Sequence, residues 1–182
     1  MIFAMNDETV DLTKQDFPQV KKLHDIIRNF LGEKAYHLSD YSDAEEANFG
    51  NIEKSIDLGT FTKLESGLLL DSSMSFTIDP EIIKSIWGKT EQIMDNGTKL
   101  AFAIHLGSHP AFRRKGKMQN NMLHGLHRLE QSGVHKVLSS VLQGNEEGSD
   151  FFYSMGFRVK ESYSKIRPDG VKRMRNVWEL NF

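Results

Sequence analysis

The stretch from Ser108 to Met118 contains the residue types that hold a phosphate group. It includes one glycine among four basic residues, namely Arg113, Arg114, Lys115, Gly116 and Lys117. An apolar run at 100–106 precedes it, and apolar residues at helical spacing follow it. A strand, a turn with a glycine and a helix start direct main-chain N–H groups and a positive helix end at an anion. The sequence therefore predicts a site for a phosphorylated ligand.

A solvated basic loop is the alternative interpretation of this turn. The apolar strand and the amphipathic helix on its two sides favour the phosphate site. A nucleotide P-loop is excluded, because Ala111 replaces the first glycine of that motif and Met118 replaces its Ser or Thr.

Metal and thiol chemistry have little support in the sequence. The chain has no cysteine, which excludes disulfides, thiolate metal sites and a cysteine nucleophile. His124 and His127 lie one helical turn apart, a spacing that suits a metal ion. Because no further ligand cluster accompanies them, we interpret both as surface residues and expect no metal.

The hydrophobic pattern predicts the elements that must position the turn. Helices are expected at 16–31, 42–56, 80–97, 117–131 and 146–155, and strands at 8–12, 59–63, 68–78, 99–107, 136–142, 157–164 and 174–182. Strands that alternate with helices and then end in a hairpin imply a mixed α/β sheet.

Length and composition are those of a soluble globular protein. The 182 residues fit a single domain, 1–182, with 38% hydrophobic and 26% charged residues. No apolar run approaches the about 20 residues of a membrane span, so no membrane partner is expected. The first residues lack the pattern of a signal peptide, and a cytoplasmic location is the default expectation.

The net charge of −2 conceals an asymmetry between the two halves of the chain. Residues 1–98 carry 9 Lys and Arg against 18 Asp and Glu, whereas residues 99–182 carry 14 against 7. A solvated surface explains such charges equally simply, but the basic half also holds the phosphate-type turn. We therefore expect one face that attracts anions and one that attracts cations.

Residues 99–158 resemble the acetyl-coenzyme A region of the GNAT superfamily of N-acetyltransferases. In that family a strand, an Arg/Gln-x-x-Gly-x-Gly/Ala turn and a helix follow one another, as they do here around Arg113 to Met118. An asparagine then follows the next strand, here Asn145, and the next helix ends in Gly156-Phe157. The resemblance implies an α/β (α+β) fold, with a mixed, mostly antiparallel sheet flanked by helices and splayed between its fourth and fifth strands.

The resemblance also assigns roles around acetyl-coenzyme A (acetyl-CoA). Main-chain amides from Arg114 to Met118 would cradle the pyrophosphate, and a main-chain N–H near Leu106 to Ser108 would polarise the thioester, which is worth about 3 kcal/mol. Asn145 would lie near the pantetheine arm, and it also suits a helix N-cap. The implied cofactor-binding residues are Leu106, Gly107, Ser108, Arg113, Arg114, Lys115, Gly116, Lys117, Met118, Asn145 and Phe152.

Two positions depart from the family pattern. Met118 replaces a small residue in the turn, and Phe152 stands where many relatives carry the tyrosine that protonates the leaving thiolate. Tyr153 is a candidate for that acid, although one helical step rotates a side chain by about 100° and a half-buried packing role is the alternative. With a thiol pKa of about 8.5, the thiolate is a tolerable leaving group even without an acid.

The sequence does not identify the general base that deprotonates the amine. His105, His109, Asp71, Glu65 and the acidic helix 42–56 are the candidates. Simple alternation along 99–107 would place Phe102, Ile104 and Leu106 on one face and His105 on the other. Because similar proteins of the family usually present their base from the face of Phe102 and Ile104, the resemblance implies a structural role for His105.

These observations predict an acetyltransferase that moves an acetyl group from acetyl-CoA to a primary amine by direct attack in a ternary complex. The acidic residues of the first half favour a cationic small-molecule or peptide acceptor; they include Asp40, Asp43, Glu45, Glu46, Glu53 and Asp57. The alternative is a sensor or scaffold that binds coenzyme A (CoA) or acyl-CoA without catalysis, because Phe152 cannot donate a proton.

Nucleic-acid binding is a third interpretation. It would use Arg113–Lys117 together with Lys172, Arg173 and Arg175. The acidic balance of the whole chain disfavours it. A monomer and a homodimer are both compatible with the sequence.

Overall fold

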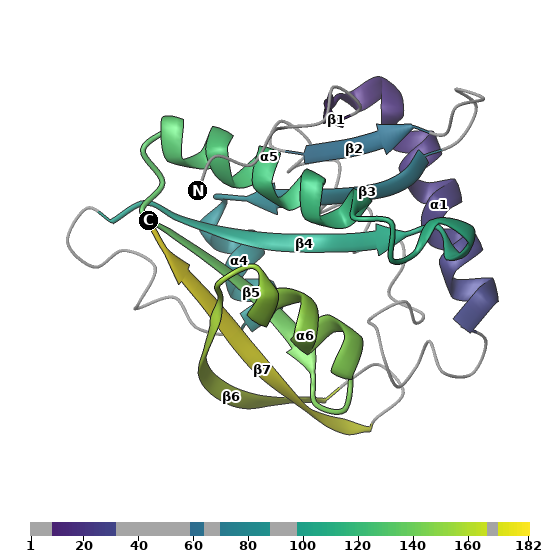
Figure 1. Ribbon diagram of the computed structural model, residues 1–182. Coiled ribbons are helices and arrows are strands. Elements are labelled where there is room, and N and C mark those ends of the chain that lie inside the picture. The colour runs from purple at the N-terminus through teal and green to yellow at the C-terminus, as the bar shows by residue number, and fades with distance from the viewer. Residues whose placement is uncertain (1–8, 32–58, 64–69, 88–97, 167–170) are drawn as a thin grey trace.

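A single mixed sheet organises the molecule (Figure 1). The computed structural model describes residues 9–31, 59–63, 70–87, 98–166 and 171–182. Within these residues, seven strands pair in the order β1-β2-β3-β4-β5-β7-β6, and only the β4–β5 pair is parallel. The strands are β1 (Thr9–Leu12), β2 (Gly59–Lys63), β3 (Leu70–Thr77), β4 (Leu100–Ser108), β5 (Lys136–Leu142), β6 (Arg158–Ile166) and β7 (Lys172–Asn181).

Helix α4 (Pro80–Trp87) begins where a capping residue in the sequence predicts. Asp79 accepts a hydrogen bond from the Glu81 N–H at 2.8 Å and so starts a helix at Pro80. The helices are α1 (Phe17–Leu31), α4 (Pro80–Trp87), α5 (Lys117–Gln131) and α6 (Glu146–Ser154), with short 3-10 turns η1 (Lys14–Asp16) and η5 (Pro110–Phe112). The expected helix 42–56 and the second half of the expected helix 80–97 lie outside the described residues.

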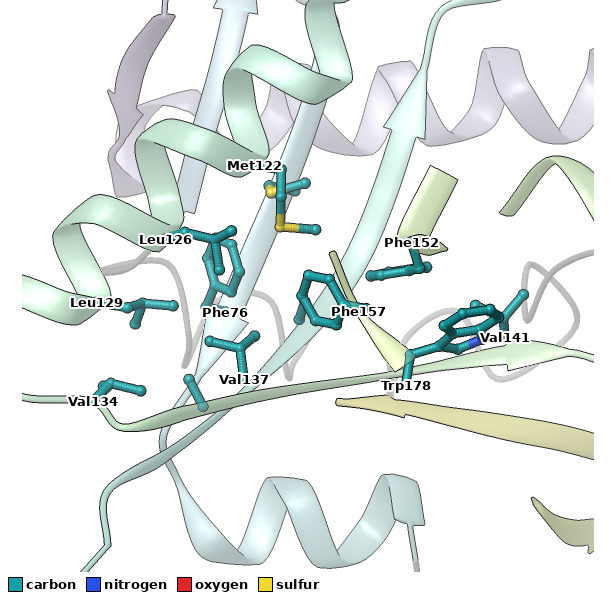
Figure 2. Packing of buried hydrophobic residues seen from close by; sticks show 13 residues of the cluster. Phe76, Met122, Leu126, Leu129, Val134, Val137, Val141, Phe152, Phe157 and Trp178 are labelled. Atoms are coloured by element: carbon teal, nitrogen blue, oxygen red, sulfur yellow. The ribbon is translucent and has the colours of Figure 1, made fainter. Parts of the chain in front are cut away.

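Helices α5 and α6 cover one face of the sheet and share one apolar core with it (Figure 2). Phe76 of β3 lies at the centre of this core, beneath Met122 and Leu126 of α5. The buried members are Met74, Phe76, Ala101, Ala103, Met122, Leu126, Leu129, Val134, Val137, Val141, Phe152, Phe157 and Trp178.

The opposite face, under α1 and α4, is built differently. Leu12, Val20, Leu23, Ile27 and Leu70 form one cluster around α1, and a second, around α4, contains Ile83, Trp87, Leu100, Phe102, Ile104, Leu138 and Val177. The two clusters share no residue. On β3, Ser73 and Ser75 alternate with Met74 and Phe76 and therefore face α1 and α4, where both serines are buried. The side of β3 that faces α1 and α4 is therefore polar at Ser73 and Ser75.

Candidate active site

Strands β4 and β5 pair over only half of their length. Their parallel register runs from Leu100 opposite Lys136 to Ala103 opposite Ser139, and the Ser139 hydroxyl donates to the Ala103 carbonyl at 3.1 Å. Beyond this point the two strands diverge (Figure 1). We call the unpaired ends, Ile104–Ser108 and Ser140–Leu142, the splay. The expected splay between the fourth and fifth strands is therefore confirmed.

A β-bulge lies at the start of the splay and overturns the simple alternation expected for β4. Ser75 pairs with Ile104 and Ser73 pairs with Gly107, so His105 and Leu106 together face one residue of β3. His105 adopts a left-handed backbone conformation with φ 54°. The expectation that Leu106 shares a face with Ile104 was wrong, because the extra residue turns Leu106 towards the core under α5 and α6.

The same bulge directs His105 towards α1 rather than away from it. Its ring lies edge-on to His24 of α1, with ring centroids 6.0 Å apart. His24 is 2% exposed, and burial lowers its pKa from 6.5 to about 4, against the opposing effect of a main-chain hydrogen bond with His105. A neutral imidazole therefore supports the bulge at neutral pH, and His105 faces the helix layer that holds Ile104.

The turn after β4 leaves main-chain donors at the start of α5. Gly116 is the N-cap residue, with φ 75°, and it makes no side-chain capping bond. A Cβ at Gly116 would meet nothing within 4 Å, so the glycine is needed for its backbone conformation and not for space. The first N–H groups of a helix have no partner within the helix, so such a start can accept an anion.

The basic side chains of this turn already have partners. Arg113 and Arg114 lie 3.4 and 3.8 Å from the carboxylate of Glu147, in the first turn of α6. Lys117 lies 3.9 Å from Asp71, which is 2% exposed, and Lys115 packs over the ring of Phe112. These contacts hold the four positively charged side chains close to the turn.

Met118 and His109, which lie on either side of the basic residues of the turn, make contacts within the protein. The side chain of Met118 packs against the apolar core, which leaves the main chain of the turn unobstructed by it. His109 lies at the start of η5, where its ring accepts the Ala111 N–H at 3.2 Å. Glu65 and the acidic residues between 40 and 57 lie outside the described residues.

Helix α6 and its N-cap residue carry the remaining expected site residues, of which one is buried and one is exposed. Asn145 caps this helix by accepting the Gly148 N–H at 3.0 Å, as its N-cap interpretation predicted. Phe152 is buried beside Phe157 and Trp178 (Figure 2), with ring centroids 5.1 and 6.3 Å away. Tyr153 is 64% exposed, and the Arg158 guanidinium covers its ring at 4.8 Å. The residue that faces the sheet is thus the one without a hydroxyl.

Sequence reasoning missed a polar cluster at the splay. Arg175 of β7 donates from Nε to the Ser140 hydroxyl at 2.5 Å and from Nη2 to the Ser140 carbonyl at 2.9 Å. The Ser140 and Tyr163 hydroxyls are 2.9 Å apart. Two adjacent serines among the apolar residues of the strand Lys136–Leu142 were the signal that could have drawn attention to this point. Because Arg175 is buried, it cannot belong to a surface patch for nucleic acid.

The two histidines at metal-like spacing have other contacts. His124 lies 2.9 Å from Asp11, and His127 lies 3.0 Å from Gln131. Within the part of the chain that the structure describes, no three His, Asp or Glu side chains gather as a metal site would require. Among the same residues, no helix is long and apolar enough to cross a membrane.

Comparison with known proteins identifies the fold. Neither a family model nor a curated protein sequence matches the chain. The ribosomal-protein-S18-alanine N-acetyltransferase from Escherichia coli is 14% identical, with 95% of this chain and 92% of that chain covered and a TM-score of 0.65. The PaiA N-acetyltransferase from Thermoplasma acidophilum, in complex with coenzyme A, is 14% identical, with 96% and 98% covered and a TM-score of 0.62.

A third similar structure is the NatC complex bound to Gag peptide and CoA. It is 12% identical, with 96% of this chain and 97% of that chain covered and a TM-score of 0.68. These likenesses span almost the full length of both partners. The chain therefore has the fold of the GNAT N-acetyltransferases, as the resemblance of residues 99–158 predicted.

Proposed function

We propose that this chain transfers an acetyl group from acetyl-CoA to an amine by direct attack within a ternary complex. The observation that carries the proposal is the splay between β4 and β5, with the uncapped start of α5 beside it. An extended chain can add to a strand edge through main-chain hydrogen bonds, which suits the pantetheine arm. A diphosphate suits the helix start.

The cofactor would bind between the turn and α6. Main-chain amides from Arg114 to Met118 would hold the pyrophosphate, with Leu106, Gly107 and Ser108 along the pantetheine arm and Asn145 at the far side. Glu147, the shared partner of Arg113 and Arg114, is largely exposed, and ion pairs to an exposed carboxylate are worth little. A phosphate can therefore replace Glu147 as the partner of these arginines at small cost.

The chemistry then needs a polarised thioester and a neutral amine. A main-chain N–H at the bulge would polarise the carbonyl as its oxygen gains negative charge. His105 is now a stronger candidate for the base than simple alternation allowed, because the bulge turns it towards α1. Asp71 is a weaker one, since it is buried close to Lys117.

The acceptor class remains a primary amine of a small molecule or peptide. The presence of a Gag peptide in the NatC structure supports peptides as one group to test. A cationic acceptor is proposed from the acidic first half of the sequence.

A binding and turnover experiment tests the proposal. Acetyl-CoA at millimolar concentration should raise the thermal midpoint, as any ligand selective for the folded state does. Thiol release should then appear with at least one member of a panel of amino acids, polyamines, aminoglycosides and short peptides. Arg114→Glu should weaken acetyl-CoA binding about 10-fold, whereas Lys172→Glu, with the same charge change on β7, should not. An unchanged thermal midpoint with acetyl-CoA would refute the assignment.

A second candidate is a protein that binds CoA or acyl-CoA without transfer. Buried Phe152 and exposed Tyr153 favour it, because the inner side of α6 offers no hydroxyl at this point. Acetyl-CoA binding with no thiol release across the whole panel would support this candidate over the enzyme.

A further inference from the structure

Three strands contribute one hydrogen-bonded polar group next to the splay. Ser140 lies on β5, Tyr163 on β6 and Arg175 on β7, and the tyrosine reaches across β7 to the serine. The Ser140 oxygen receives a hydrogen bond from Arg175 Nε at 2.5 Å and lies 2.9 Å from the Tyr163 hydroxyl. Arg175 is only 8% exposed, so its charge acts in a poorly solvated setting where electrostatic effects are larger.

The position of Ser140 at the splay connects this polar group to the proposed acetyl transfer. Ser139 is the last residue of β5 that pairs with β4, so Ser140 is the first residue of the splay on that side. In the antiparallel pair of β5 and β7, opposite residues alternate between pairs that exchange main-chain hydrogen bonds and pairs that do not. Gln143 donates its N–H to the Met174 carbonyl, so this pair is hydrogen-bonded, and the pair of Ser140 and Val177, three positions away, is not. Ser140, opposite Val177, therefore directs its carbonyl towards β4, where Arg175 Nη2 reaches it.

The proposed reaction lacks an acid on α6. Phe152 occupies the inner side of that helix and cannot donate a proton, while Tyr153 lies on the exposed side under Arg158. Ser140, in contrast, lies at the narrow end of the splay, which is where the thioester at the tip of the pantetheine arm would sit. A hydroxyl there would be within reach of the leaving sulfur.

We propose that Ser140 protonates the leaving thiolate, with Tyr163 and Arg175 as its positioning residues; this rests on the proposed acetyl transfer. The amine nitrogen forms a bond to the acetyl carbon, and the carbon–sulfur bond breaks with its electron pair passing to sulfur. Sulfur takes the proton of the Ser140 hydroxyl. Tyr163 passes its proton to the Ser140 oxygen and regains one from solvent, while the proton released by the amine goes to the base.

The hydrogen bonds of Ser140 suit this task. Arg175 donates to the Ser140 oxygen, and when Tyr163 also donates to it, the serine O–H is left to point elsewhere. The guanidinium stabilises the negative charge that develops on the oxygen as the proton leaves. The role that many relatives give to a helix tyrosine would thus be taken by a strand serine on the other side of the splay.

The test compares four variants with the amine that gives the wild-type protein its fastest thiol release from acetyl-CoA. Ser140→Ala and Tyr163→Phe should each lower kcat about 10-fold, at the low end for acid catalysis because a thiolate leaves readily. The acetyl-CoA-induced thermal shift should not change. Ser140→Thr, which keeps a hydroxyl, should retain most activity, and Tyr153→Phe should match the wild type.

Two further readouts separate catalysis from folding. The solvent deuterium isotope effect on kcat should fall towards unity in Ser140→Ala, because no proton then moves as sulfur leaves. The double variant should lose no more than the worse single one, since both residues serve one relay. Wild-type kcat and isotope effect in soluble Tyr163→Phe and Ser140→Ala would overturn this inference while leaving acetyl transfer intact. A wild-type protein that releases no thiol would overturn both.

Discussion

Acid is expected to destabilise the fold through His24, the buried histidine that faces the bulge. Its pKa falls from 6.5 to about 4 on folding, chiefly because burial penalises the charged ring. The unfolded chain therefore takes up a proton as the pH falls below 6.5, whereas the folded chain stays neutral until about 4. The folded state keeps its full stability above pH 6.5 and loses this contribution as the pH falls towards 4.

The size of the effect follows from the two pKa values. Each pKa unit corresponds to about 1.4 kcal/mol, so the loss approaches about 3 kcal/mol near pH 4. At pH 5 the loss is about 2 kcal/mol, which is a large share of the about 5–15 kcal/mol that stabilises a typical domain.

Urea unfolding at pH 7.5 and pH 5, followed by tryptophan fluorescence, measures this loss. His24→Leu removes the titrating ring, so the wild-type protein should lose about 2 kcal/mol more than the variant between the two pH values. Comparing differences between pH values cancels any change in packing that the substitution causes. His127→Gln, an exposed histidine of α5, is the control and should follow the wild type. Equal pH dependence in the wild type and His24→Leu would refute the assignment of acid sensitivity to this residue.

Three other substitutions test particular contacts. Gly125→Ala should lower the free energy of unfolding, measured by urea titration, by about 1–2 kcal/mol. The added Cβ would lie 2.3 Å from the buried Phe76 ring, and this overpacking outweighs the gain in helix propensity. A variant more stable than the wild type would contradict this. Asn145→Ala should cost about 1 kcal/mol by the same measurement through loss of the α6 cap, whereas Asn145→Asp should not. Glu147→Gln should tighten acetyl-CoA binding a few-fold in calorimetry at low salt, because Arg113 loses a competing anion; the gain should vanish at high salt.

Local sequence signals predicted most of the elements. The helix at 117–131 and the strands at 59–63 and 136–142 have the predicted bounds, because glycines lie at or near their ends, at Gly59, Gly116, Gly133 and Gly144. The phosphate-type turn was visible for the same reason, since a strand, a glycine and a helix start are adjacent along the chain.

The features that sequence reasoning missed depend on contacts between distant segments. The bulge in β4 follows from its register with β3. The residue types of Ile104, His105 and Leu106 do not indicate that β4 has one residue more than β3 at this point. The group of Ser140, Tyr163 and Arg175 exists only because three strands pair side by side. Hydrophobic periodicity cannot reveal which polar residues meet across a sheet.

The separate apolar cluster under α1 has a consequence for local opening. Because that cluster shares no residue with the one under α4, α1 can detach from the sheet without disturbing the main core. Its amide hydrogens should therefore exchange with deuterated water through a partial opening that costs less free energy than global unfolding. The amides of β5 from Lys136 to Ser139, where this strand pairs with both β4 and β7, should exchange only when the whole sheet opens.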